Sequence, residues 1–395
     1  MTSNDGTDDL VALGCVSECE IPSKTDSLFQ EMDNFISEHK NSYLFACLSY
    51  DLKNHNEDLK SENSDEINFP LLKIWKPKIV VSIKEGSFTC LQGEINFDYE
   101  QEINSIIHSK KNNHNLPQID FVPRISKEEY SNRVKKIKKE ISLGNVYELN
   151  FCQEFLSKNV PEFDSFSLFN KLNNLSKATF SAYLNLPNYE VFCASPERFI
   201  QKSGERLISQ PIKGTIQRGK NEKEDEMLKN QLINDPKERA ENIMITDLVR
   251  NDFSRIAEKN SVQVDELCGL YSFGTVHQLI STISCTIKKG ISFSQILKAT
   301  FPMGSMTGAP KISAMEISEK HESFKRGLYS GSIGYFKPNA DFDFNVVIRS
   351  FILNKQSKVL SASVGGAITN QSISEKEYEE CLVKIQALLN LFKHD

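Results

Sequence analysis

Five strand-like segments follow one another between residues 146 and 209, and their spacing constrains the fold more than any other feature of the sequence. The last four are separated by gaps of hairpin length, which favours antiparallel pairing over the helical crossovers that parallel strands need. Helices come in clusters elsewhere, without regular alternation of strand and helix. We therefore predict an α+β fold built on antiparallel sheets. The segments are Val146–Phe155, Thr179–Leu186, Tyr189–Cys193, Arg198–Lys202 and Glu205–Ser209.

A polar segment divides the sequence into two parts. Residues 109–118 contain almost no apolar side chain and include a proline, as linkers often do. We expect an N-terminal lobe over residues 1–118, with a partly disordered start of about 20 residues. A larger region over residues 119–395 follows, and it contains most of the informative motifs.

Net charge and cysteine usage exclude several classes of protein. The formal net charge is −6, whereas proteins that bind nucleic acids or membrane surfaces need a basic face. The nine cysteines are scattered and never form a Cys-x-x-Cys pair, so neither a disulfide framework nor a zinc cluster is indicated. The sequence shows no signal peptide and no apolar run of about 18 residues. We expect a cytoplasmic protein that binds neither nucleic acid nor membrane.

One lysine, Lys213, lies between an isoleucine and a glycine in the short stretch Pro211–Thr215, at the expected end of a strand. Two interpretations are open from the pattern alone. The lysine is a surface charge at a turn, or it acts on an anionic small molecule. The rest of the chain has to decide between them.

A helix is predicted over Asp235–Ile256, and two of its acidic residues fall on its apolar face. The segment begins with an Asp cap followed by proline. On a helical wheel, Glu241 and Asp252 lie within the stripe of Ile245 and Leu248. A buried carboxylate costs several kcal/mol unless a cation or hydrogen-bond donors meet it. The candidate partners are a Mg²⁺ ion or the side chains of Arg250, Arg255 and Lys213.

Two glycine-containing segments are candidate ligand contacts. Phe301–Lys311 is a loop that runs into a helix, and such a junction favours an anion, although ordinary turns have the same composition. Gly365 and Gly366 end a strand and would let a ligand approach the backbone closely. A β-bulge is the commoner explanation for paired glycines in a strand.

Several charged or titratable side chains have structural interpretations from the pattern alone. Arg349 lies in an otherwise apolar strand, where it forms a salt bridge or grips a carboxylate in bidentate fashion. His277 is a single histidine among strand residues, and we expect a hydrogen-bonded structural role. Glu380 and Lys384 lie opposite the apolar stripe of the last helix, which predicts a solvent-facing ion pair.

Eight segments together resemble the chorismate-utilising family, which contains anthranilate synthase, isochorismate synthase and aminodeoxychorismate synthase component I. They occur in family order over about residues 125–395, and eight ordered segments argue against a chance match. The resemblance implies two packed, mainly antiparallel sheets with helices outside, and an N-terminal lobe intertwined with the rest into one unit. The segments are Ser195–Phe199, Pro211–Thr215, Ala240–Asp252, Gly304–Met315, Gly331–Tyr335, Ile348–Arg349, Gly365–Ala367 and Glu377–Glu380.

Two positions distinguish members of this family. Anthranilate synthases typically have a small residue where this chain has Lys213, and the Pro-Ile-Lys-Gly-Thr form is similar to aminodeoxychorismate synthases. Isochorismate and salicylate synthases have a lysine base where this chain has Glu148. The resemblance therefore implies an enzyme that aminates chorismate to 4-amino-4-deoxychorismate, on the route to 4-aminobenzoate and folate.

The resemblance also assigns roles to individual residues. Lys213 would add to C2 of chorismate as the C4 hydroxyl leaves, and Glu197 would protonate that hydroxyl. The amine must be neutral, so its pKa has to fall by roughly 2–3 units from about 10.4. Glu241 and Glu380 would hold Mg²⁺. The implied substrate contacts are Gly214, Thr215, His277, Ser305, Tyr335, Arg349, Gly365, Gly366 and Lys384.

The family further implies a separate glutamine amidotransferase subunit that supplies ammonia. The nearest alternative function is that of an anthranilate synthase component I, which releases pyruvate together with an aromatic amine. An alternative of another class is a non-catalytic regulatory module that binds an amino acid such as tryptophan. The joint presence of Lys213, Glu197, Glu241 and Glu380 argues against such a module.

Overall fold

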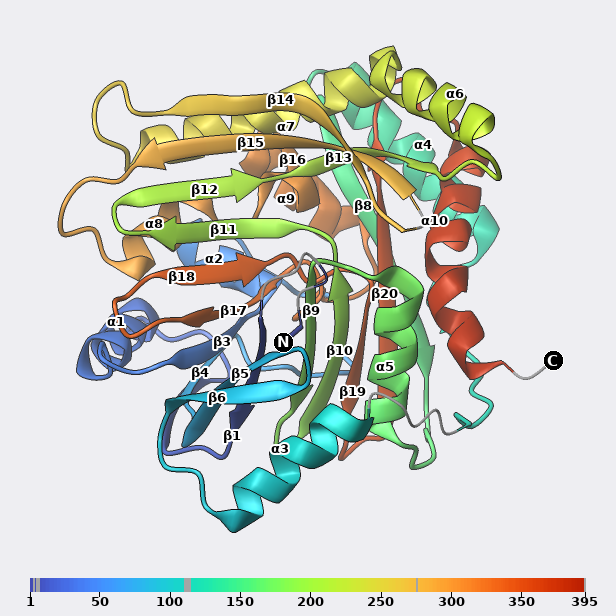
Figure 1. The fold of residues 1–395 in the computed structure, drawn as a ribbon. Helices are drawn as coiled ribbons and strands as arrows, with labels where there is room; N and C mark the ends of the chain where they lie inside the picture. Colours follow the sequence, from blue (N-terminus) through green and yellow to red (C-terminus); the bar gives the residue numbers. More distant parts are fainter. Residues whose placement is uncertain (3, 5–7, 110–114, 275, 394–395) are drawn as a thin grey trace.

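Two large antiparallel sheets form the centre of the molecule, with most helices on their outer faces (Figure 1). The computed structural model describes residues 1–2, 4, 8–109, 115–274 and 276–393. The predicted α+β class with packed antiparallel sheets is confirmed. The sequence had not indicated a third, three-stranded sheet. It consists of β1 (Asp9–Leu13), β5 (Ile79–Lys84) and β6 (Ser87–Gln92).

The larger sheet has ten strands and draws on both parts of the chain. Near one edge, β3 of the N-terminal part pairs with β17 of the second part, so one sheet runs through both. Its strands, in order, are β13 (Ile212–Gln217), β15 (Val276–Thr286), β12 (Arg206–Gln210), β11 (Arg198–Ser203), β18 (Phe342–Asn345), β17 (Ser332–Phe336), β3 (Leu44–Leu48), β4 (Leu72–Lys76) and β2 (Ser17–Ile21), with β14 (Gln263–Ser272) paired to β15.

The second large sheet has seven strands, which run across the direction of the ten-stranded sheet in Figure 1. An apolar cluster of buried side chains lies on each large sheet. The strands of the seven-stranded sheet, in order, are β16 (Gly308–Ala309), β8 (Glu148–Ser157), β20 (Val359–Ile368), β19 (Ser350–Asn354), β10 (Tyr189–Ser195) and β9 (Phe180–Asn185), with β7 (Val122–Pro123) paired to β8.

Each large sheet has its own set of covering helices. On the ten-stranded sheet these are α6 (Glu222–Ile233) and α7 (Pro236–Ser254). The predicted start of α7 is confirmed, because the Asp235 side chain accepts hydrogen bonds from the backbone N–H groups of Lys237 and Glu238. The seven-stranded sheet contacts α5 (Ser165–Ser176), α9 (Lys311–His321) and α10 (Ser374–Leu389), with α4 (Lys127–Ser142) against α10. Further helices are α1 (Leu28–Glu38), which packs on α8 (Phe293–Thr300), α2 (Lys53–Asn56) and α3 (Phe97–Ser109).

The N-terminal lobe was expected to begin with a disordered segment and to end at a linker. β1 and β2 lie within the first 21 residues, so the disordered start that we expected does not extend over these strands. Part of the expected linker, residues 110–114, lies outside the described residues. None of the described helices combines the length and the apolar character that a bilayer crossing requires.

The two adjacent glycines of β20 differ in how closely their neighbours approach. The register between β20 and β8 runs without interruption from Leu360 to Ile368, so the β-bulge interpretation is wrong. A Cβ atom at Gly365 would lie 2.7 Å from Sγ of Cys152. At Gly366 the nearest atoms would be 3.9 Å away. Packing against β8 therefore requires glycine at position 365 and tolerates a methyl group at position 366.

We expect Gly365→Ala to lower the free energy of unfolding by about 1–3 kcal/mol, because an added methyl group overpacks a tight contact. Gly366→Ala is the matched control on the same strand and should change stability by less than about 0.5 kcal/mol. Urea denaturation followed by circular dichroism measures both. Equal effects of the two substitutions would contradict the packing argument.

Candidate active site between the two large sheets

Two of the segments that connect one large sheet to the other carry a residue of the expected site. One crossing joins β10 to β11 through Glu197, and the other joins β18 to β19 through Arg349. The crossings hydrogen-bond to each other. The N–H of Val346 donates to the carbonyl of Glu197 (3.0 Å), and the N–H of Ala194 donates to that of Arg349 (3.1 Å). Sheet topology thus brings Glu197 and Arg349 together.

Lys213 reaches from the ten-stranded sheet to the seven-stranded sheet. Its Nζ lies 3.0 Å from Oε1 of Glu148 on β8, and the two side chains are 12% and 1% exposed. The interpretation of Lys213 as a surface charge is therefore wrong. The next residue, Gly214, has φ +94°, which suits glycine, and it lies in an irregularity of the β13–β15 register.

The protonation state of Lys213 differs from the one that we expected. Burial would lower the pKa of the ammonium, yet the carboxylates around it outweigh burial and raise the pKa. They belong to Glu148, Glu241 and Glu197. In this structure Lys213 is an ammonium held by Glu148, and the lowered pKa expected from the sequence is absent.

Glu197 is a buried carboxyl group with a hydrogen-bond donor fixed on it. The Ser305 hydroxyl donates to Oε1 of Glu197 at 2.6 Å, and both residues are buried. Burial raises the pKa of Glu197 to about 7, although Ser305 and Lys213 oppose the shift. The carboxyl group is thus partly protonated at neutral pH. Ser305, which we expected to contact substrate, holds this acid in place.

A group of acidic side chains lies where α7 meets α10. Glu241 is buried, and its Oε1 has no hydrogen-bond partner among the residues that the structure describes. Burial raises its pKa to about 7. Nζ of Lys237 lies 3.8 Å from Oε1 of Glu241 and 3.9 Å from Oε1 of the buried Glu377. The group therefore offers carboxylate oxygens that are only weakly neutralised.

This donor set fits a hard cation such as Mg²⁺, which prefers carboxylate oxygens. Two observations support that fit: Oε1 of Glu241 accepts no hydrogen bond from a described residue, and the ammonium group of Lys237 already lies beside it. Within the described part of the chain, no three His, Cys, Asp or Glu side chains form a ready-made metal site. Glu377 belongs to the segment Glu377–Glu380 that carries the resemblance, but the sequence analysis gave it no role at the metal site, because acidic residues in a first helical turn also favour the helix dipole.

The Glu380–Lys384 ion pair predicted for the last helix is confirmed. Nζ of Lys384 lies 2.7 Å from Oε1 of Glu380, with the side chains 46% and 51% exposed. The same Nζ donates to the carbonyl oxygen of Gly365 at 3.4 Å. Of the two expected metal ligands, Glu241 is thus buried, whereas Glu380 is half-exposed and paired.

The second acidic residue on the apolar face of α7 has a partner that we had not considered. Oδ2 of Asp252 lies 2.6 Å from Nζ of Lys311, at the start of α9. Arg250, one of the candidates, instead pairs with Asp247 on the exposed face. The expected metal or arginine partner of Asp252 is therefore corrected to Lys311.

The loop before α9 contributes structure rather than an open anion site. Its Gly308 pairs with Leu149 of β8, where a Cβ atom would lie 2.1 Å from the carbonyl oxygen of Glu148. The N–H groups of Met306 and Thr307 donate to carbonyl groups within the loop. The ordinary-turn interpretation thus holds for these amides.

His277 and its neighbour point to opposite faces of β15. His277 is fully buried, with Nε2 2.9 Å from Oδ1 of Asp225 and Nδ1 2.8 Å from Oγ of Ser272. This matches the structural role expected from the pattern. Gln278 instead lies beside Thr215, to whose Oγ1 its Nε2 donates at 3.3 Å. Oε1 of Gln278 is buried without a hydrogen-bond partner in the described ranges, and the sequence analysis missed this residue.

Arg349 lies between β18 and β19, not within a strand as we expected. Its φ of +50° falls in the left-handed region, which costs about 1–3 kcal/mol for such a residue. Burial lowers the pKa of its guanidinium group. The described residues offer that group no hydrogen bond or ion pair in the structure. A half-buried, unpaired arginine is available for an anion.

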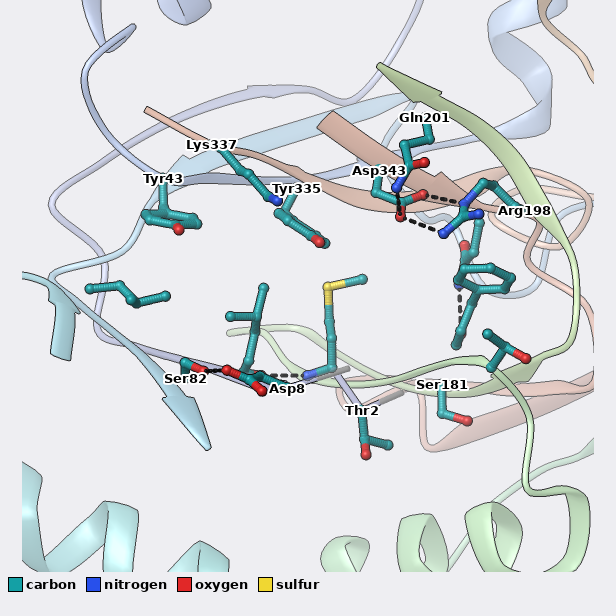
Figure 2. A pocket seen from close by; sticks show the side chains of 16 residues that line it. Thr2, Asp8, Tyr43, Ser82, Ser181, Arg198, Gln201, Tyr335, Lys337 and Asp343 are labelled. Atoms are coloured by element: carbon teal, nitrogen blue, oxygen red, sulfur yellow. Dashed lines mark hydrogen bonds and ion pairs between the residues drawn. The ribbon is translucent and has the colours of Figure 1, made fainter. Parts of the chain in front are cut away.

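Tyr335 lies apart from this group, in a cavity of about 370 Å³ (Figure 2). Figure 2 shows Tyr335 beside Lys337, with the ion pair of Arg198 and Asp343 on the same cavity wall. The Tyr335 ring packs on Phe45. No other residue of the expected site lines this cavity.

Comparisons with known proteins place the chain in a family. A family model described as chorismate binding enzyme matches residues 1–390. The chloroplastic aminodeoxychorismate synthase of Arabidopsis thaliana is 42% identical over 285 residues, which are 70% of this chain and 31% of that protein. Aminodeoxychorismate synthase component 1 of Bacillus subtilis is 36% identical over 269 residues, 68% of this chain and 56% of that protein. The chain thus spans less than two thirds of these relatives.

Solved structures share the fold. Anthranilate synthase component I from Streptococcus pneumoniae has a TM-score of 0.82 over 98% of this chain and 93% of that chain, at 23% identity. The menaquinone-specific isochorismate synthase from Escherichia coli has a TM-score of 0.78 over 99% and 87%, at 17% identity. Because the family model matches nearly the whole sequence, the chain belongs to the family of chorismate binding enzymes.

Proposed function

We propose that this protein aminates chorismate at C4 to form 4-amino-4-deoxychorismate. The observation that carries the proposal is Lys213, which is buried between the sheets and surrounded by carboxylates. Once it has lost a proton, a lysine in that position is an amine nucleophile kept from solvent. Relatives that are 36–42% identical are named aminodeoxychorismate synthase, which supports the assignment.

The substrate is a dianion, and the site offers cations for both carboxylates. The unpaired guanidinium of Arg349 binds one of them in bidentate fashion. Lys384, whose Nζ donates to the carbonyl oxygen of Gly365 at 3.4 Å, and the backbone at Gly365 and Gly366 are the proposed contacts of the other carboxylate. Thr215 contacts the substrate ring beside Lys213. There Oε1 of Gln278 accepts a hydrogen bond from a hydroxyl group of the substrate.

Glu197, Lys213 and Glu148 carry the proposed proton transfers and bond changes. Glu197 gives its proton to the C4 hydroxyl, which leaves as water, while the neutral amine of Lys213 forms a bond to C2 and the ring double bonds shift. Ammonia then attacks C4, the double bonds shift back and the C2–N bond to Lys213 breaks. The lysine proton must be lost first, and Glu148, 3.0 Å away, is the nearest acceptor.

Glu241 and Glu380 are the proposed ligands of Mg²⁺, with Glu377 beside them. The bound ion supplies charge neutralisation among these carboxylates and a Lewis acid for a substrate oxygen. Its loss should leave the carboxylates to repel the dianionic substrate. We therefore expect that chelation of divalent metal abolishes turnover and that added Mg²⁺ restores it.

Ammonia comes from a partner in this proposal. The bacterial relatives are named component 1, which suggests a second component. We propose a glutamine amidotransferase subunit that hydrolyses glutamine and passes ammonia to the site between the sheets. Ammonium salts at high pH should replace that subunit in vitro.

The product of the reaction tests the function. The protein is incubated with chorismate, Mg²⁺ and ammonium, with and without a lyase that converts 4-amino-4-deoxychorismate to 4-aminobenzoate. We expect 4-aminobenzoate only when the lyase is present. Pyruvate and a fluorescent amine without the lyase would indicate an anthranilate synthase instead. Tryptophan binding without chorismate consumption would indicate a regulatory module.

A further inference from the structure

Lys237 projects from the first turn of α7 into the space between α7 and α10. Its Nζ lies 3.8 Å from Oε1 of Glu241 and 3.9 Å from Oε1 of Glu377. Both carboxylates are nearly buried, whereas the lysine side chain is 38% exposed. One ammonium therefore faces two carboxylates and keeps a route to solvent.

The distances distinguish Lys237 from the permanent ion pairs of this protein. Lys213 and Lys311 approach their carboxylate partners to 3.0 Å and 2.6 Å, as hydrogen-bonded buried pairs do. Lys237 stays beyond hydrogen-bond distance of both carboxylates, and Oε1 of Glu241 accepts no hydrogen bond from any described residue. The ammonium is held by charge alone.

The surroundings require positive charge at this point. Glu238 and Glu380 also act electrostatically on Lys237, in addition to the two carboxylates that it faces. Lys384 pairs with Glu380, and Lys213 pairs with Glu148 while it also acts on Glu241. Lys237 is the lysine that lies within 4 Å of both Glu241 and Glu377. Without Lys237 the repulsion between Glu241 and Glu377 would be less well compensated.

We propose that Lys237 is a resident counter-ion of the metal site and that a divalent cation has to displace it. This inference rests on the proposed metal-binding role of Glu241. In the metal-free protein the ammonium neutralises the carboxylates. When Mg²⁺ takes their oxygens, the lysine swings to solvent along its exposed side. Lys237 thereby weakens metal binding and protects the free protein from charge repulsion.

Titration of the chorismate-free protein with Mg²⁺ alone, by calorimetry, tests this role. Lys237→Met should bind Mg²⁺ with a Kd about five- to tenfold lower than the wild type, because no cation has to leave. Lys237→Arg keeps the charge and should show no such gain. Lys376→Met, which removes an exposed charge on α10, controls for the change in net charge.

Thermal unfolding gives a second readout. Without metal, the melting temperature of Lys237→Met should be lower than that of the wild type. Added Mg²⁺ should raise it by more than it raises that of the wild type, because ligand binding stabilises the folded state. Lys237→Gln serves if the methionine variant does not fold. An unchanged or higher Kd in Lys237→Met overturns the inference.

Glu241→Gln shows which part of the argument fails. If it weakens Mg²⁺ binding while Lys237→Met leaves the Kd unchanged, the metal assignment stands and only the counter-ion role falls. If Glu241→Gln binds Mg²⁺ like the wild type, both fall. Product formation from chorismate is a separate readout, so failure of the proposed amination would not alter these affinities.

Discussion

Lys213→Met is expected to lower the rate of chorismate amination by at least about 10³-fold, because the substitution removes the proposed nucleophile. Wild-type protein mixed with chorismate and Mg²⁺, without ammonia, should gain mass through a covalent adduct. The variant should gain none. Intact-mass spectrometry detects the adduct, and the coupled lyase assay measures the rate.

The variant needs a control for folding, because Lys213 also neutralises Glu148. Removing the lysine leaves a carboxylate that is 1% exposed without its partner, which should cost about 3–5 kcal/mol of stability. The double variant Lys213→Met, Glu148→Gln removes both charges and should recover most of that stability. It should remain inactive. Full activity in Lys213→Met, together with no adduct on the wild type, would refute covalent catalysis.

Local pattern predicted the strands of this fold, whereas the arrangement of the sheets depends on contacts between distant segments. Hairpin spacing correctly placed the strands between residues 146 and 209. The same spacing did not reveal that β10 and β11 belong to different sheets. Glu197 and Arg349 lie together because two such crossings hydrogen-bond to each other, and a one-dimensional pattern carries no information about that.

Side chains in the site were predictable where a single periodicity determined their position. The helical wheel found Glu241 and Asp252 on the buried face of α7, and both are buried. It could not supply their partners, since Lys311 is 59 residues from Asp252 in the sequence. Strand periodicity separates His277 from Gln278, but it does not show which face meets Lys213.

The pKa of Lys213 illustrates why the chemistry of a site is harder to predict than its location. The resemblance implied a lowered pKa for the Lys213 amine, and burial alone lowers the pKa of an amine. Glu148 comes from β8 in the other sheet, and its contact with Lys213 reverses the shift. A residue first noticed because it differs from a lysine base in related enzymes is therefore the main partner of the proposed nucleophile.

The rate of adduct formation on Lys213 should fall as the pH rises through about 7, because Glu197 must be protonated to release the hydroxyl. Burial raises the pKa of Glu197 to about 7, so the acid form predominates below that pH and disappears above it. The rate is measured by rapid quench and mass spectrometry without ammonia, whose own protonation would otherwise obscure the profile.

Glu197→Gln should slow adduct formation by about 10²–10⁴-fold and remove this fall at alkaline pH. Ser305→Ala is the matched positioning variant. The Ser305 hydroxyl stabilises the ionised form of Glu197 and lowers its pKa, so its loss should shift the fall to higher pH without abolishing it. A profile that still falls near pH 7 in Glu197→Gln would mean that another group supplies the proton. An unchanged profile in Ser305→Ala would mean that the hydrogen bond at 2.6 Å does not tune the acid.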